Sequence, residues 1–200
     1  MRFSFSSFPT TPQQVSVPLL VLCISLLAYI FDARLSEFFV YQRSLVTQGE
    51  VWRVFSSHFF HTNGFHFLLN AAAVVMLWAL HGQFYTIKSY LVVFLISAIV
   101  CSIGIHSFSP NIGQYVGLSG VLHGLFIWGA IEDIKAKERT GYLLLLGVIL
   151  KITHEQYYGA SKDVADLIGA NVAINAHLWG AIGGVLAVFF LMIIKSKTKK

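Results

Sequence analysis

The sequence predicts an all-α membrane protein whose helices cross the bilayer six times. The 200-residue chain is 56% hydrophobic and 12% charged, with a mean hydropathy of +0.70, whereas soluble domains carry roughly 25% charged residues. Its apolar residues also gather in runs separated by polar stretches, and a helix of roughly 20 residues crosses a bilayer core about 30 Å thick. We therefore expect a single membrane domain over residues 1–200, in contact with lipid.

Polar or charged residues separate six apolar runs. Their approximate bounds are 17–31, 66–80, 90–105, 118–131, 142–152 and 172–194, and the fifth run extends toward Tyr157. We expect the polar stretch 1–14 to be a cytoplasmic N-terminal segment and the stretch 195–200 to be a basic cytoplasmic tail. The first run is long and lacks a small-residue cleavage site, so we expect an uncleaved span and not a signal peptide.

The basic residues indicate how these spans are oriented. With six helices, both termini and the second and fourth connections lie on one side, which carries nine Lys and Arg residues against five on the other. Because cytoplasmic loops carry an excess of Lys and Arg, we expect both termini to lie in the cytoplasm. The membrane we expect is the inner membrane of a bacterial cell. The net charge of +5 sits in short clusters between spans, which argues against a nucleic-acid partner.

The fourth span is too short to cross the bilayer. From Leu118 to Glu132 there are about 14 residues, which rise roughly 21 Å as a helix. The preceding stretch, residues 107–116, contains Pro110 and Gly113 and is poor helix material. Irregular backbone at membrane depth is tolerated only where it is buried in protein or lines a water-filled cavity. We therefore expect such a cavity, open to the outer side, with the start of the fourth helix at its floor.

Ser119 stands in the first turn of this helix, within Gly117-Leu118-Ser119-Gly120. The backbone N–H groups and the positive dipole end of a helix N-terminus can stabilise the oxyanion that forms when a serine attacks a carbonyl carbon. A serine that merely caps the helix, flanked by glycines that allow close packing, would explain the same tetrapeptide. On the tetrapeptide alone, both interpretations stay open.

A nucleophilic serine needs a base, and histidine is the usual one. His177 begins the sixth span, three residues before Gly180, which forms a GxxxG pair with Gly184. Such a pair lets a neighbouring helix approach closely. A histidine inside a membrane span is costly and is a functional hypothesis by default, so we expect His177 to be the partner of Ser119.

Depth in the membrane gives a quantitative check. At about 1.5 Å per residue from the cytoplasmic helix ends, Ser119 lies roughly 20 Å and His177 roughly 27 Å from that side. His66 and Asn70, spaced i and i+4 on one face of the second span, lie at roughly 17–23 Å. These two side chains, with the backbone at Gly117 and Ser119, can stabilise an oxyanion. Polar contacts between helices would explain them as well.

Four motifs, in this order along the chain, resemble the rhomboid family of intramembrane serine proteases. They are Trp52-Arg53, His66-x-x-x-Asn70, Gly117-x-Ser119-Gly120 and Ala176-His177-x-x-Gly180. The resemblance covers the whole chain and implies a six-helix rhomboid bundle that cleaves membrane-anchored proteins with a Ser–His dyad and no third member. Ser119 would be the nucleophile and His177 the general base and acid. The side chains of His66 and Asn70 and the backbone of Ser119 and Gly117 would stabilise the oxyanion. Gly120 and Gly180 would support the packing around the site. Trp52 and Arg53 would hold the structure of the first loop.

One stretch resembles the rhombosortase subgroup more closely. It spans residues 117–124, and the small size of the chain and the Glu155-Gln156 pair after the fifth span add to the likeness. Those enzymes are associated with substrates that carry a C-terminal Gly-rich motif, a transmembrane helix and a basic tail. The resemblance thus implies single-pass membrane proteins as substrates, and it implies no metal or other cofactor.

His123 departs from the family's pattern. Many rhomboids carry a tyrosine four residues after the nucleophile, packed against the catalytic histidine, and this chain has His123 there. We expect His123 to stack on His177 or to hydrogen-bond within the site. It could compete as the base, although a side chain at i+4 on the same helix runs alongside the Ser119 hydroxyl and not toward it.

Two histidine groups invite a metal interpretation. His58, His61 and His66 cluster in the outward loop that enters the second span, where loop packing is the simpler explanation. The stretch 154–158 nearly reads as the zinc motif HExxH, but Tyr158 replaces the second histidine that this chemistry needs. We therefore expect no metal.

Two other classes of function are compatible with the composition. The first is a catalytically inactive rhomboid relative that acts as a membrane binding or chaperone protein, and the presence of both Ser119 and His177 argues against it. The second is a small membrane transporter, which would predict paired carboxylates at mid-depth in the spans. We find no such pair in the sequence.

Overall fold

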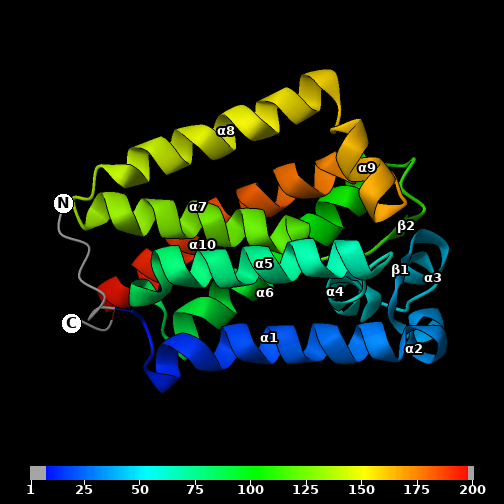
Figure 1. Ribbon diagram of the computed structural model, residues 1–200, viewed down its shortest axis with the longest axis horizontal. Helices are drawn as coiled ribbons and strands as arrows, with labels where there is room; N and C mark the ends of the chain where they lie inside the picture. The colour runs from blue at the N-terminus through cyan, green and yellow to red at the C-terminus, as the bar shows by residue number, and fades with distance from the viewer. Residues whose placement is uncertain (1–7, 198–200) are drawn as a thin grey trace.

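A computed structural model describes residues 8–197 and shows an elongated bundle of helices (Figure 1). The positions 1–7 and 198–200, which include parts of the expected N-terminal segment and basic tail, lie outside the described residues. Six helices of 17 residues or more follow the six expected apolar runs and extend most of them by a few residues. They are α1 (Pro12–Ile30), α5 (Gly64–His81), α6 (Ile87–Phe108), α7 (Ser119–Lys135), α8 (Thr140–Tyr158) and α10 (Ile174–Lys197).

Four helices in the described part are long and apolar enough to cross a membrane. They are α1, α6, α10 and α5 taken together with the 3-10 turn η3 (Gly82–Phe84). Helix α7 has only 17 residues, and the last turns of α8 are polar, with Lys151, His154 and Glu155. The fold is therefore an all-α, multi-pass membrane bundle, as the sequence predicts. The number of complete crossings, six, stays a prediction.

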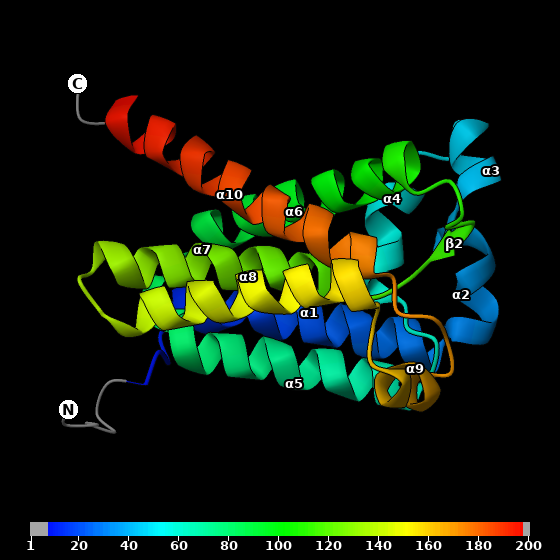
Figure 2. The same cartoon turned by 90° about the horizontal axis from the view of Figure 1, so that it is seen from above.

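Three of the connections between long helices lie together at one end of the bundle (Figures 1 and 2). They hold the short elements α2 (Asp32–Phe39), α3 (Arg43–Thr47), α4 (Arg53–Ser56), η2 (Ser57–Phe59) and α9 (Lys162–Ile168), and the antiparallel strands β1 (Tyr41–Gln42) and β2 (Gln114–Tyr115). The start of α1, the end of α10 and the α5–α6 and α7–α8 connections lie at the opposite end. This alternation is what an even number of spans predicts. Which end faces the cytoplasm stays a prediction.

Helix α8 packs at the edge of the bundle. The main core is built from apolar side chains of α1, α5, α6, α7 and α10, among them the buried Trp128 and Tyr90. Helix α8 contributes Val148 and Ile152 to a smaller cluster, where they meet α7 and α10. Figure 1 shows α8 diverging from α5 along its length. A cavity lined by side chains of α5, α7 and α8 lies on this side of α8.

Arg53 and Trp52 form hydrogen bonds within the first loop. Arg53 is 3% exposed. Its guanidinium donates to the Glu50 carboxylate at 2.6 Å and to the carbonyl oxygens of Val40 and Glu37 at 2.7 and 2.8 Å. The Trp52 Nε1–H donates to a backbone carbonyl of α2 at 3.0 Å. These bonds join α4 to α2 and to the residue that follows it, Val40.

Arg43 closes the C-terminal end of α6. The last carbonyl groups of a helix have no partner within the helix, and a guanidinium offers five N–H donors. The Arg43 side chain donates to four backbone carbonyl oxygens of α6 and of the segment that follows it, at 2.6 to 3.2 Å. The acceptors are Ile105, His106, Ser109 and Ile112. The chain can therefore leave α6 and turn back toward the bundle without exposing these groups to lipid.

Helices α7 and α10 approach each other closely because each presents two glycines to the other. A Cβ atom added to either α10 glycine would overlap the α7 backbone, so that nothing larger than a hydrogen atom fits there. Small residues at helix interfaces in membranes permit such contact. Ser119 and His177 lie at the end of this contact nearest to β2 and α9, which brings them together. The glycines are Gly120 and Gly124 on α7 and Gly180 and Gly184 on α10.

Candidate active site

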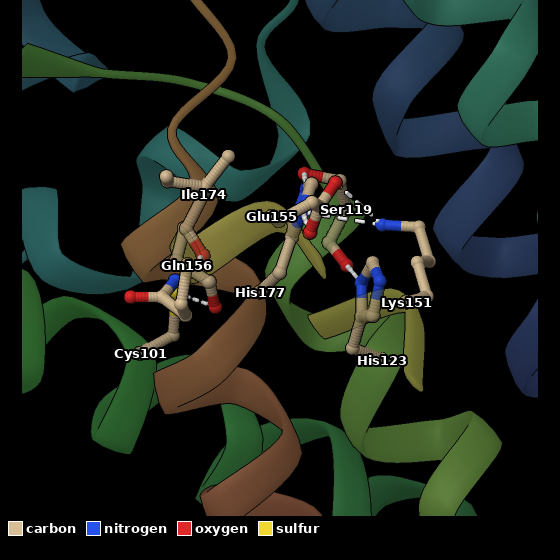
Figure 3. Close-up of polar contacts among 9 residues, drawn as sticks. Cys101, Ser119, His123, Lys151, Glu155, Gln156, Ile174 and His177 are labelled. Carbon is tan, nitrogen blue, oxygen red and sulfur yellow. Dashed lines mark hydrogen bonds and ion pairs between the residues drawn. The ribbon is translucent and has the colours of Figure 1, made fainter. Parts of the chain in front are cut away.

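Ser119 is the first residue of α7, and Leu118 occupies the N-cap position. The side chain of Ser119 is directed toward α10 and not back over its own helix end, because its Oγ lies 3.1 Å from Nε2 of His177 (Figure 3). This geometry favours the nucleophile interpretation over helix capping. The start of α7 is where backbone N–H groups lack partners within the helix, so an oxyanion formed at Ser119 would lie beside hydrogen-bond donors.

His177 is 5% exposed and has protein partners at both ring nitrogens. Its Nε2 faces Ser119, and its Nδ1 lies 2.8 Å from Oε2 of Glu155. A proton on Nδ1 satisfies both contacts, because Nδ1–H then donates to the carboxylate and Nε2 accepts the serine O–H. In this tautomer His177 is ready to take the proton of the Ser119 hydroxyl.

Glu155 is the site residue that the sequence analysis missed. Helix α8 continues to Tyr158, so Glu155 lies within it and not after the span. The carboxylate is divided between two partners: Oε2 faces His177, and Oε1 accepts from Nζ of Lys151 at 2.7 Å. A dyad with no third member, as the resemblance implies, does not account for this contact. The signal in the sequence is an acidic residue one helical turn after Lys151, within the incomplete zinc motif and the Glu155-Gln156 pair, and neither pattern indicates a contact with His177.

His123 lies against His177, at the position where many rhomboids carry tyrosine. The two imidazole rings are stacked, with centroids 4.2 Å apart and planes 19° from parallel. Nδ1 of His123 lies 2.7 Å from the backbone carbonyl of Ser119, one turn earlier on α7. A carbonyl only accepts, so Nδ1 carries the proton. His123 thus contacts the backbone of Ser119 through this nitrogen, while His177 contacts the hydroxyl.

A cluster of three side chains has ligand atoms within 4.8 Å of one another: His123, Glu155 and His177. An imidazole binds a metal through a lone pair that lies in the plane of the ring. Two nearly parallel, stacked rings cannot direct such lone pairs at one ion, and both nitrogens of His177 already face protein groups. The cluster as arranged does not fit a metal.

His58 packs the loop beneath the site. It is fully buried, its Nδ1 lies 3.3 Å from the carbonyl oxygen of Gly117, and its Nε2 lies 3.0 Å from the Ser102 hydroxyl. His61 stacks edge-on against His66, with ring centroids 5.0 Å apart. In the part of the chain that the structure describes, these three histidines do not form a group of metal ligands.

His66 and Asn70 both face Gly117, which lies two residues before Ser119. Nδ1 of His66 accepts from the backbone N–H of Thr62 at 3.3 Å, so its proton is on Nε2. That nitrogen would lie 2.7 Å from a Cβ atom added to Gly117, and the Asn70 amide nitrogen would lie 3.9 Å from it. The Asn70 amide also donates to the His66 carbonyl at 3.0 Å. The His66 Nε2–H therefore points toward the backbone at Gly117, in the segment that leads into Ser119.

Two cavities meet this group of residues. One, of about 110 Å³, lies over Ser119 and is lined by the start of α5, by β2 and by residues 168–173. The other, of about 310 Å³, is apolar and lies between α5, α7 and α8, with His123 and Lys151 in its wall. The cavity expected above the short fourth helix is therefore present at Ser119. The apolar groove beside it was not expected.

Comparison with known proteins identifies the family. The rhomboid domain model matches residues 48–194. The chain belongs to the rhomboid family. The matched range begins before Trp52 and ends after Gly184, so the four motifs and the glycine contact between α7 and α10 lie inside it. Helix α1 precedes the matched range.

Several curated proteins resemble this rhomboid. Rhomboid protease GluP of Bacillus subtilis (strain 168) is 26% identical over 157 residues, which are 78% of this chain but only 29% of the length of GluP. Putative rhomboid protease YdcA of the same organism is 25% identical over 152 residues, 76% of this chain and 73% of YdcA. Rhomboid protease GlpG of Yersinia enterocolitica serotype O:8 is 28% identical over 200 residues, covering 94% of this chain and 67% of GlpG. Family and relatives together support an intramembrane serine protease, a hydrolase.

Proposed function

We propose that this rhomboid is an intramembrane serine endopeptidase in which Ser119 is the nucleophile and His177 is the general base and acid. The observation that carries the proposal is the contact of 3.1 Å between Ser119 Oγ and His177 Nε2. A nucleophile and its base need a heavy-atom distance of about 2.6–3.2 Å. Here the two side chains come from different helices that glycines hold in close contact.

The reaction follows from these positions. Ser119 Oγ attacks the carbonyl carbon of the scissile peptide bond, and His177 Nε2 takes the hydroxyl proton. The carbonyl oxygen becomes an oxyanion, for which the N–H groups at the start of α7, His66 Nε2–H and the Asn70 amide are the candidate donors. His177 then gives its proton to the leaving amine as the C–N bond breaks. Water, activated by His177, hydrolyses the acyl-enzyme and frees Ser119.

The apolar groove supports entry of a membrane-anchored substrate from the side. It lies between α5 and α8, is lined by apolar residues such as Met76, Leu122 and Phe126, and reaches His123 next to the candidate site. A substrate helix must unwind locally before Ser119 can reach a carbonyl group, because helical carbonyls are engaged in hydrogen bonds. Glycine and other small residues make this unwinding easier.

The finer proposal is that the substrates are single-pass proteins with a C-terminal Gly-rich motif followed by a transmembrane helix and a basic tail, as for rhombosortases. Its support is the resemblance in residues 117–124 and the small cavity over Ser119, about 110 Å³, which suits small side chains at the cleavage site. We propose a single membrane domain in a bacterial inner membrane, with both termini cytoplasmic and the cavity open to the outer side. The charge distribution supports this orientation.

The test is cleavage of a co-expressed single-pass substrate, followed by immunoblot of both products. We expect Ser119→Ala and His177→Ala each to lower the rate by roughly 10⁴-fold or more, since removing either member disables the whole reaction. Matched controls are Ser196→Ala and His154→Ala, both at exposed positions, which should cleave at the wild-type rate. Cleavage by Ser119→Ala or His177→Ala at a near wild-type rate would refute the proposal.

The same assay tests the substrate class. Two substrates that differ only in the presence of the Gly-rich segment should be cleaved at rates at least tenfold apart if the finer proposal holds. Equal rates for the two substrates would leave a rhomboid protease of general specificity and would remove the rhombosortase assignment.

A further inference from the structure

A carboxylate inside the bundle contacts the His177 ring nitrogen that faces away from Ser119. Glu155 is 9% exposed and extends from α8 to the Nδ1 atom of His177 on α10, which in turn reaches Ser119 on α7 (Figure 3). The three side chains thus form one line of hydrogen bonds across three helices, with distances of 2.8 and 3.1 Å. The proposed function uses only the last two of them.

Burying a carboxylate is unfavourable unless it is paired and hydrogen-bonded. Glu155 has both kinds of compensation, because one oxygen faces His177 and the other accepts from Lys151 at 2.7 Å. Lys151 lies one turn earlier on α8 and is half-exposed at the groove. A lysine at such a position can reach water or the membrane interface with its long side chain, so it does not need a buried partner.

We propose that Glu155 is a positioning residue that completes a Ser119–His177–Glu155 triad. This inference rests on the proposed function of Ser119 and His177 and goes beyond the dyad that the family resemblance implies. The carboxylate accepts the Nδ1–H of His177, which fixes the tautomer in which Nε2 can accept the serine proton. It also stabilises the imidazolium that exists after that transfer, while the Nδ1 proton stays on His177.

The positive charge of Lys151 makes the negative charge of Glu155 more important for the protonation of His177. Its ammonium lies 3.5 Å from Nδ1 of His177 as well as 2.7 Å from Glu155. A positive charge at that distance opposes formation of the imidazolium, and Glu155 lies where it offsets the effect. Replacing Glu155 by glutamine therefore removes the acceptor charge and leaves the opposing charge of Lys151 in place.

A purely structural role makes a different prediction. If Glu155 served only as the counter-ion of Lys151, four residues earlier on the same helix, it would be dispensable once that lysine is uncharged. If Glu155 positions His177, its loss must matter whether or not Lys151 is present. A double-mutant cycle separates these two roles.

The experiment measures kcat and KM of purified protein in proteoliposomes for wild type, Glu155→Gln, Lys151→Met and the double variant Lys151→Met/Glu155→Gln. Because triad carboxylates of soluble serine proteases contribute roughly 10⁴-fold to kcat, we expect Glu155→Gln to lower kcat by roughly 10²–10⁴-fold in both backgrounds with little change in KM. Thermal unfolding shows whether each variant is folded. The double variant has no unpaired charge and keeps the side-chain volumes, so it stays informative if the single variant is unstable.

Glu138→Gln, at an exposed position in the α7–α8 connection, is the matched control and should keep the wild-type kcat. The inference is overturned if the double variant has the kcat of Lys151→Met, or if Glu155→Gln has the kcat of wild type. Either result, obtained with inactive Ser119→Ala and His177→Ala, would leave the proposed function intact. Activity in those two alanine variants would instead refute the proposed function itself.

Discussion

Replacement of Gly117 by alanine tests whether the loop that enters α7 determines the position of His66. Gly117 has φ = +117°, a region that costs a residue with a side chain about 1–3 kcal/mol. The added Cβ would lie 2.7 Å from Nε2 and 2.8 Å from Cε1 of His66, whereas ordinary contact begins at 3.4 Å. The imidazole or the loop must therefore retreat by about 0.7 Å, the difference between the first and last of these distances.

A shift of this size displaces a candidate oxyanion donor without removing it. Misplacement by 1 Å can lower a rate by roughly 10²-fold, and loss of a whole oxyanion donor costs roughly 10²–10³-fold in kcat. We expect Gly117→Ala to lower kcat by roughly 10–100-fold with a smaller change in KM, measured with purified protein and a membrane substrate in proteoliposomes.

Gly113→Ala is the matched control for this variant. Gly113 lies in the same segment, has no positive φ, and has no atom within 4 Å of an added Cβ. It should keep the wild-type kcat. If the kcat of Gly117→Ala were within threefold of that of Gly113→Ala, the assignment of His66 to oxyanion stabilisation would be wrong.

Two further predictions concern stability, measured by thermal unfolding in detergent. Gly184→Ala should lower the free energy of unfolding by about 1–3 kcal/mol, as overpacking does. The reason is that its Cβ would overlap the backbone at Gly124. The control is Gly147→Ala, whose Cβ meets no atom within 4 Å and which should not destabilise the protein. Equal stability of the two variants would contradict the close contact of α7 and α10. Arg53→Lys should destabilise by about 1–3 kcal/mol for each buried carbonyl left unpaired, because one ammonium cannot reach the three acceptors of the guanidinium. Arg34→Lys, at an exposed position, is its control, and an equal loss in both variants would rule out this reasoning.

The proximity of Ser119 and His177 was accessible from the sequence because its causes are local. A stretch with proline and glycine ends before Ser119 and a short apolar run follows, which predicts a helix beginning at the serine. The GxxxG pair that starts at Gly180 predicts close approach of another helix near His177. Each feature depends on a few neighbouring residues, but a GxxxG pair does not specify which helix approaches it. The pairing of Ser119 with His177 therefore also needed the agreement in depth and the resemblance to the rhomboid family.

The contact of Glu155 with His177 depends on features that no short stretch of sequence contains. It requires α8 to continue past its apolar residues, since the run ends near Ile152 and the next turn is polar. It also requires a particular rotation of α8 about its axis, which is set by packing against α7 and α10. Arg43 is a similar case, because its carbonyl partners lie 62 to 69 residues away in the chain.

Different sets of hydrogen bonds hold the two walls of the cavity over Ser119. On one side, the strand pair β1–β2 and the bonds that Tyr115 and His58 make to the Gly117 carbonyl anchor the segment that leads into α7. On the other side, residues 168–173 follow α9, which is joined to the start of α5 by hydrogen bonds from Thr62 and Asn63 to the carbonyl oxygens at the end of α9. The bonds on the α9 side involve neither Ser119 nor His177. Substitutions in residues 168–173 can therefore change the size and shape of the cavity without breaking the contact between the serine and its histidine, so the choice of side chains that fit and the accuracy of attack depend on different parts of this fold.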